Sequence, residues 1–227
     1  DCVLQRTLGR EISCTGVGLH SGAQVTLRLM PASVDTGIIF ERTDLFDLDP
    51  VVPAVWDRVV DTRLCTVIGN DDGVTVGTIE HLLAALAGCG VDNAYVELNG
   101  PEVPIMDGSS EPFVSLIGCA GVVELLAPRR VIRVLKAVNV KIEDSRAALL
   151  PAAWPKLDME IDFQNTVVSN QALSIGLVNG SFCKELARAR TFGFLHEVEQ
   201  MRAAGLAKGG SLDNAIVISK NGILNDG

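Results

Sequence analysis

The feature that most constrains the fold of this chain is the order strands, helix, strand, which occurs twice. In the first half, residues 25–31 (VTLRLMP) alternate apolar and polar side chains, which is the period of a half-buried β-strand. Apolar residues recur at helical spacing over 78–88, and residues 92–100 (DNAYVELNG) again indicate a strand. The same reasoning predicts strands at 36–42, 63–69 and 73–77, a glycine- and proline-rich loop at 101–113, and a helix that begins near Ser110.

After "LLAPRR" the pattern begins again. It predicts strands at 131–144, 147–152, 157–163, 172–178 and 211–219, and helices at 181–189 and 194–205. We therefore expect an α+β fold of two similar domains with a boundary near Pro128. The first domain is residues 1–127 and the second is residues 128–227.

The two halves differ in how they end. In the first half a loop and a closing helix follow the strand at 92–100, whereas the strand at 211–219 is followed only by KNGILNDG. The second domain is therefore expected to be incomplete at its C-terminus. A sheet face without its covering helix would expose apolar side chains.

Composition narrows the class of partner. The formal net charge is −9, the aromatic content is 4%, and no cluster of Lys and Arg occurs, which argues against a nucleic-acid binder. No apolar run reaches the roughly 18 to 20 residues of a membrane helix, and the first residues do not resemble an export signal. Six scattered cysteines without a C-x-x-C pair favour a reducing compartment. We expect a cytoplasmic protein whose partner is a small molecule or another protein.

One pair of residues in the predicted helix suggests chemistry. Glu80 and His81 are the only acidic or basic side chains between Asp72 and Asp92. On a helical wheel His81 lies opposite the apolar stripe, on a side that otherwise carries small residues and so allows another element to approach closely. The stripe consists of Ile79, Leu82, Leu83 and Leu86, and the small residues are Ala84, Ala85 and Gly88.

The pair has two interpretations. In the structural one, Glu80 is a first-turn carboxylate favoured by the helix dipole, Thr78 caps the helix, and His81 is a solvated or hydrogen-bonded side chain. In the functional one, the same dipole favours the neutral imidazole that a metal binds, and the adjacent carboxylate removes a proton from water. The spacing alone does not decide between them, because a catalytic zinc needs three protein ligands.

Other polar positions carry the same ambiguity. His20 lies between glycines in GVGLHSG and is either a turn residue or a contact to a ligand. Asp107 precedes a glycine, as turns often require for backbone reasons alone. Thr191 follows a predicted helix and is either a cap or a donor to a developing oxyanion, whereas Phe192 and Phe194 are either core residues or the mouth of an apolar channel.

Several longer stretches together resemble one family. They are TGVGLHSG, DTRLCT, TIEHLLAALAGCGVDNAYVELNGPEVPIMDGSSEPFV, ARARTFGF and GLAKGGSLDNAIV. In this order, and over essentially the whole chain, they resemble the UDP-3-O-acyl-N-acetylglucosamine deacetylases, zinc hydrolases that commit Gram-negative bacteria to lipid A synthesis. The resemblance implies two α+β domains that face one another with the active site between them, a UDP-linked acyl-glucosamine substrate, and a monomer.

The resemblance also implies a role for particular residues. His81 is expected to be a zinc ligand, Glu80 the general base, and Thr191 a donor that stabilises the oxyanion. His20 is expected near the site, and Leu64 and Cys65 are expected to approach the metal. The second domain is expected to carry an inserted β-α-β unit that forms an apolar passage for the acyl chain. The residues expected to contact the substrate there are Phe192, Phe194, Val198, Ala207, Ser211, Ala215 and Val217.

The chain departs from the family pattern in one respect. The family takes its other two zinc ligands from an H-K-x-x-D helix and its general acid from a later histidine, and no H-x-x-x-D occurs in these 227 residues. The missing ligands are expected C-terminal to Gly227, so residues 1–227 alone are expected to bind zinc weakly and to be inactive. The alternatives are a non-catalytic protein that binds acyl groups and nucleotide sugars, and a structural fragment that another chain completes.

Overall fold

The computed structural model of the chain describes residues 3–163, 166–178 and 180–225. Its largest element is a five-stranded sheet in which β3 and β4 flank β9. The β4–β9 pair is parallel, and the other pairs are antiparallel. In sheet order the strands are β2 (Ile12–Val17), β3 (Gln24–Pro31), β9 (Ala94–Leu98), β4 (Ile38–Arg42) and β5 (Val51–Pro53).

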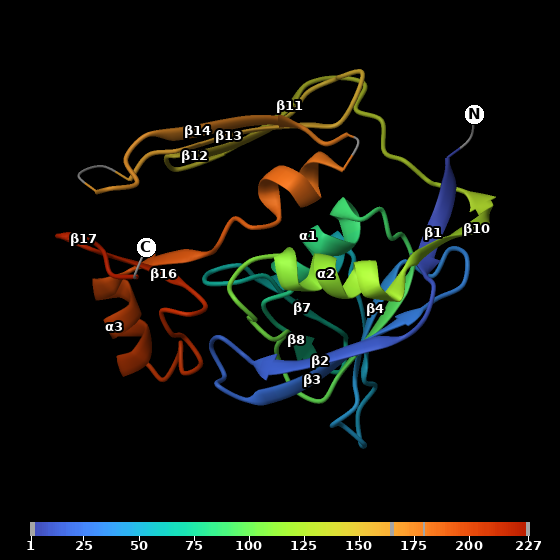
Figure 1. The fold of residues 1–227 in the computed structure, drawn as a ribbon, viewed down its shortest axis with the longest axis horizontal. Helices are drawn as coiled ribbons and strands as arrows, with labels where there is room; N and C mark the ends of the chain where they lie inside the picture. The colour runs from blue at the N-terminus through green and yellow to red at the C-terminus, as the bar shows by residue number, and fades with distance from the viewer. Residues whose placement is uncertain (1–2, 164–165, 179, 226–227) are drawn as a thin grey trace.

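Two helices complete the first half and cover the sheet (Figure 1). They are α1 (Glu80–Gly88) and α2 (Glu111–Ala120), and they contact one another as well as the core. The alternation predicted for 25–31 is confirmed, because Val25, Leu27 and Leu29 of β3 are fully buried while the residues between them are exposed. Phe40 of β4 and Phe113 of α2 are the largest fully buried side chains of this core.

Smaller elements surround this core. Near the N-terminus β1 (Leu4–Leu8) pairs with β10 (Val122–Pro128), so the strand before the predicted boundary returns to the start of the chain. A second sheet contains β6 (Val59–Asp61), β7 (Val67–Gly69) and β8 (Thr75–Val76). A single 3-10 turn, η1 (Trp56–Arg58), precedes it.

Residues after Pro128 form separate hairpins. The antiparallel pair β11 (Val138–Ile142) and β12 (Ser145–Leu149) is followed by the antiparallel pair β13 (Lys156–Ile161) and β14 (Gln171–Gly176). Figure 1 shows both hairpins in a layer beyond the helices of the first half. The strand predicted from residue 131 begins only at Val138. The earlier part, which includes the nearly fully exposed Ile132, has no strand partner there and forms no strand.

The hairpins expose apolar surface. Every residue of β11, β12 and β13 is exposed, and in β14 only Ile175 is buried. Large apolar side chains exposed in this region include Val138, Val140, Ile142, Leu149, Leu157, Met159, Ile161 and Leu173.

The last described segment is a β-α-β arrangement. Strands β15 (Phe192–Phe194) and β16 (Ile216–Ser219) are parallel, and α3 (Leu195–Ala203) lies between them in sequence. The short β17 (Gly222–Ile223) adds to β16. The helix predicted at 181–189 is shorter than expected and is a π-helical turn, η2 (Phe182–Leu186).

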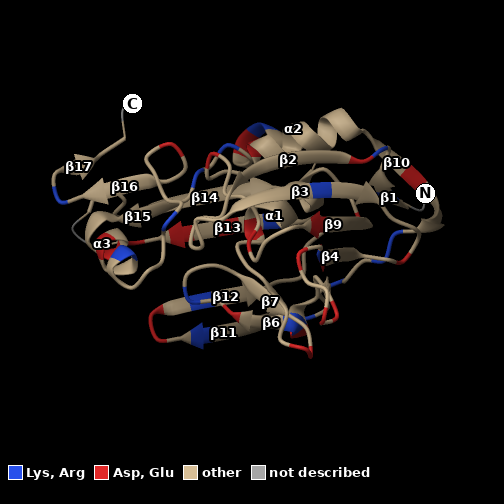
Figure 2. Cartoon of the chain, turned by 90° about the horizontal axis from the view of Figure 1, so that it is seen from below, with Lys and Arg blue, Asp and Glu red and all other residues tan. Residues whose placement is uncertain are grey.

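The α+β class is confirmed, whereas the division at Pro128 into two domains stays a prediction. Figure 2 shows Lys and Arg distributed among Asp and Glu over several elements rather than gathered on one of them. Across residues 3–163, 166–178 and 180–225, no helix is both long enough and apolar enough to cross a bilayer.

Candidate active site

The first turn of α1 presents Glu80 and His81. The backbone N–H of Thr66 donates a hydrogen bond to Glu80 Oε2 at 3.1 Å, which orients the carboxylate. The carbonyl of His81 accepts a hydrogen bond from Ser110 Oγ at 2.9 Å. The ring nitrogen Nδ1 of His81 is buried and has no hydrogen-bond partner among the described residues. Because a buried polar atom is costly when unpaired, this nitrogen is suited to a ligand that is not part of the chain.

Neither helix is capped by the side chain of its N-cap residue. Thr78 precedes α1, but its hydroxyl donates to Glu102 Oε1 at 2.7 Å instead of capping the helix. The N-cap of α1 is Ile79, which has no side-chain cap. At α2 the hydroxyl of Ser110 is used by the carbonyl of His81, while Ser109 Oγ accepts from the Glu111 N–H at 3.1 Å. Thr78 and Ser110 therefore connect the helix starts to other segments, whereas Ser109 bonds within its own loop and to the start of α2.

The face of α1 that carries small residues does receive another element. A Cβ at Gly88 would overlap the ring of Phe182, so only glycine lets η2 lie against the helix here. At the next residue of each segment, the Sγ atoms of Cys89 and Cys183 are 3.9 Å apart. Burial, with Cys183 nearby, raises the pKa of Cys89 to about 12. Ala85, which the wheel placed on this face, is instead fully buried with the core.

The loop before α2 connects α1 to Thr191. Its Asp107 is a turn residue, because the Ser109 N–H donates to Asp107 Oδ1 at 2.9 Å, and this supports the structural interpretation. The carbonyl of Gly108 accepts from the Thr191 N–H at 2.8 Å. Because Ser110 in the same loop binds the carbonyl of His81, one short segment contacts both predicted catalytic regions.

An apolar cavity of about 260 Å³ lies within the β-α-β segment. Eight of the residues singled out in the sequence line it: His20, Thr191, Phe192, Val198, Ala207, Ser211, Ala215 and Val217. Phe194 is not among its lining residues. Its ring instead lies 5.3 Å, centroid to centroid, from that of Phe163 and stacks on His196.

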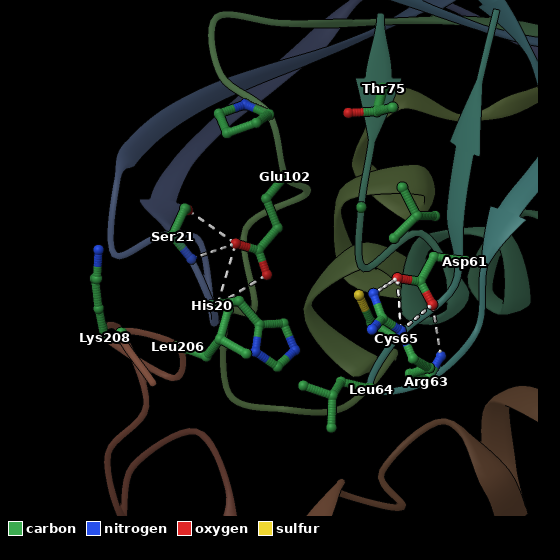
Figure 3. A pocket seen from close by; sticks show the side chains of 14 residues that line it. His20, Ser21, Asp61, Arg63, Leu64, Cys65, Thr75, Glu102, Leu206 and Lys208 are labelled. Carbon is green, nitrogen blue, oxygen red and sulfur yellow. Dashed lines mark hydrogen bonds and ion pairs between the residues drawn. The ribbon is translucent and has the colours of Figure 1, made fainter. Parts of the chain in front are cut away.

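A larger cavity of about 690 Å³ lies beside the first (Figure 3). His20 lines both cavities, and Figure 3 shows its ring between Glu102 and Leu64. Both ring nitrogens of His20 are buried without a partner in the described part of the chain.

Leu64 and Cys65 form another part of the wall of the larger cavity. Leu64 is 53% exposed, so it is open to a ligand. Burial raises the pKa of the Cys65 thiol and the carboxylates of Glu80 and Glu102 add to this, while hydrogen bonding with Thr78 lowers it. The thiol therefore lies beside the start of α1.

Sequence reasoning missed Glu102. Its side chain is 4% exposed and accepts hydrogen bonds from the backbone of the 18–22 turn and from Thr78. Burial raises the pKa of its carboxyl, but the bonds from Ser21, Thr78 and His20 outweigh burial and lower it below the usual 4.5. The one sequence feature that points to Glu102 is its place as a single carboxylate between two prolines in PEVPI, a segment that is otherwise apolar.

The site contains one candidate metal ligand. The orphaned Nδ1 of His81, beside a carboxylate, fits one ligand of a divalent cation. Within the described ranges, no group of three His, Cys, Asp or Glu side chains is placed to hold an ion. His81 thus fits one ligand position, and the described residues do not supply a complete ligand set.

Comparison with known proteins agrees with this arrangement. The family model of LpxC, UDP-3-O-acyl N-acetylglycosamine deacetylase, matches residues 5–227. A UDP-3-O-acyl-N-acetylglucosamine deacetylase of Myxococcus xanthus is 53% identical over 222 residues, which are 97% of this chain and 70% of that protein. The proteins of the same name from Saccharophagus degradans and Pseudomonas entomophila are each 51% identical, over 99% of this chain and 74% of their own length. The chain therefore belongs to the LpxC family of UDP-3-O-acyl-N-acetylglucosamine deacetylases.

Proposed function

We propose that this protein hydrolyses the acetamide of a UDP-linked, 3-O-acylated N-acetylglucosamine, in the committed step of lipid A synthesis. Acetate is released and the free amine remains on the sugar. The observation that carries the proposal is the apolar cavity whose lining includes Thr191, a residue that hydrogen bonds connect through the loop of Gly108 and Ser110 to His81. The family membership supplies the substrate class.

The cavity accounts for recognition of the acyl chain. Its lining includes Val198, Ala207, Ala215 and Val217, whose apolar side chains suit an alkyl chain. Burying a methylene group stabilises a complex by about 0.8 kcal/mol. A long acyl group therefore contributes binding energy that the sugar alone does not.

Zinc is the proposed cofactor, and His81 is the residue of this chain that would hold it. A bound zinc ion supplies polarisation of the acetamide carbonyl and activation of water at neutral pH. Glu80, one residue before His81 and oriented by the Thr66 amide, accepts the proton of the attacking water.

Thr191 is the proposed donor to the developing oxyanion. Its backbone is fixed on both sides, since its N–H donates to Gly108 and its carbonyl accepts from the Ile216 N–H at 2.9 Å. A hydroxyl held in this way stabilises the negative charge without reorganising.

The reaction is tested with full-length protein and a UDP-3-O-acyl-N-acetylglucosamine. We expect acetate release that stops after treatment with a chelator and returns when Zn²⁺ is added, because no side chain of the site replaces the ion. Saturable binding of the substrate without any acetate release would contradict the proposal and favour the non-catalytic binding protein. Acetate release that a chelator does not affect would refute the role of the metal.

Zinc binding by residues 1–227 alone is expected to be weak. One imidazole gives far lower affinity than the three protein ligands of a catalytic site. Metal analysis of this polypeptide after dialysis is expected to find much less than one zinc per chain, and His81→Ala is expected to lower the remainder further. A stoichiometric, tightly held ion in residues 1–227 would contradict this expectation.

A further inference from the structure

Glu102 joins two segments of the site through one buried carboxylate. Its Oε1 accepts from the Thr78 hydroxyl at 2.7 Å and from the His20 N–H at 3.0 Å. Its Oε2 accepts from the N–H and the Oγ of Ser21 at 2.9 and 2.8 Å. Both segments therefore meet at this carboxylate. Figure 3 shows its contacts with His20 and Ser21.

The first segment is the start of α1. Thr78 has a φ of 54°, in the left-handed region that costs a β-branched residue strain energy, and it is 2% exposed. Its hydrogen bond to Glu102 offsets this cost. Because Thr78 lies two and three residues before Glu80 and His81, the direction in which the first helical turn leaves it determines where both side chains point.

The second segment is the turn at residues 18–22. Its Leu19 carbonyl accepts from the Gly209 N–H at 3.0 Å, which fixes the turn against the segment that contains Ala207. His20 of the turn lines both cavities, and Ala207 lines the apolar one. The position of this turn therefore sets the position of one wall of the apolar cavity.

The carboxylate has neutral donors only. Its five hydrogen bonds come from four donors, all of them backbone amides or hydroxyls, because the His20 N–H also reaches Oε2 at 3.1 Å. No Lys or Arg among the described residues forms an ion pair with it. An amide in its place offers at most one oxygen to donors that now use two. At least one segment then loses its hydrogen bond, and a buried donor is left unpaired.

We propose that Glu102 is a positioning residue that holds the first turn of α1 and the 18–22 turn in one fixed relation, so that Glu80 and His81 stay aligned with the apolar cavity. This inference rests on the proposed function. It adds that the acyl cavity and the reacting groups share a single anchor.

The inference can be tested without measuring turnover, by NMR of residues 1–227. These residues contain only three histidines, so each ring signal can be assigned. In Glu102→Gln we expect the ring ¹H–¹⁵N signals of both His20 and His81 to shift, whereas those of the exposed His196 on α3 stay in place. Glu124→Gln, at an exposed position on β10, is the matched control and is expected to move none of the three. Unchanged His20 and His81 signals in folded Glu102→Gln would overturn the inference.

A second pair of variants applies if Glu102→Gln does not fold. Thr78→Val removes the hydroxyl at nearly constant shape and is expected to shift His81 and His20 together. Thr78→Ser retains the donor and is expected to restore both signals. Movement of His81 alone in Thr78→Val would show that the two segments are not coupled, and would also overturn the inference.

Kinetics of the full-length protein then separate positioning from simple acyl binding. Glu102→Gln is expected to lower kcat by roughly 10- to 100-fold for long-chain and short-chain substrates alike, since both use α1. KM is expected to rise for the long-chain substrate only. A change confined to the long-chain KM would reject the link to α1. If the wild-type protein releases no acetate, the proposed function fails, while the histidine signals still decide the role of Glu102.

Discussion

Replacing Glu80 by glutamine is expected to lower kcat of the full-length protein by about 10²- to 10⁴-fold. The amide oxygen can still accept the hydrogen bond from the Thr66 N–H, so the side chain keeps its place while losing its ability to accept a proton from water. The loss therefore falls on the chemical step, and KM for the acylated substrate is expected to change little. Steady-state measurement of acetate release gives both constants.

Glu124→Gln serves as the control for this variant as well, because it removes one carboxylate from an exposed site on β10. Its kcat is expected to equal that of the wild type. A thermal unfolding curve for Glu80→Gln that matches the wild type would show that the fold is intact. If such a folded variant retained more than a tenth of the wild-type kcat, another group would have to accept the proton.

Replacing Gly108 by alanine is expected to destabilise the protein by roughly 2 to 4 kcal/mol. Gly108 has a φ of +84°, which strains any residue with a side chain, and a Cβ there would overlap the backbone carbonyl of Asn214. Because the overlap is with backbone, a rotamer change cannot relieve it. The loop must move away from Thr191, so kcat is expected to fall together with the midpoint of urea unfolding.

Gly118→Ala is the matched substitution, and its expected effect has the opposite sign. Gly118 lies in α2 with no atom within 4 Å of an added Cβ. Alanine at this position is expected to stabilise the helix by up to about 1 kcal/mol. Equal unfolding midpoints for the two alanine variants would show that the contact of Gly108 with Asn214 is not important for stability.

Local signals predicted the first half of the fold well. The alternation in β3 and the apolar stripe of α1 follow from burial on one side of each element, and a single sequence contains that information. The strand predicted from residue 131 was wrong, because the information needed there is not local. Its residues are apolar and β-branched, but a strand also needs a neighbour to accept its hydrogen bonds, and propensity does not reveal whether one exists.

In the candidate site, too, the local features were predictable and the long-range contacts were not. Glu80 and His81 are adjacent in sequence, so their proximity was visible at once, and the proposed role of Thr191 came from the family resemblance. The network around Glu102 was not predictable in this way. Its donors lie 82, 81 and 24 residues away, at His20, Ser21 and Thr78, and only the packed fold brings them together.

The uneven distribution of burial has a consequence for how the molecule unfolds. Every side chain of the main hydrophobic core comes from Leu8 to Ala120, whereas the hairpins β11–β14 bury almost nothing. Residues 8–120 thus form a cooperative unit with its own free energy of unfolding. The hairpins can open and close beside it in frequent local fluctuations, without weakening the sheet that carries α1.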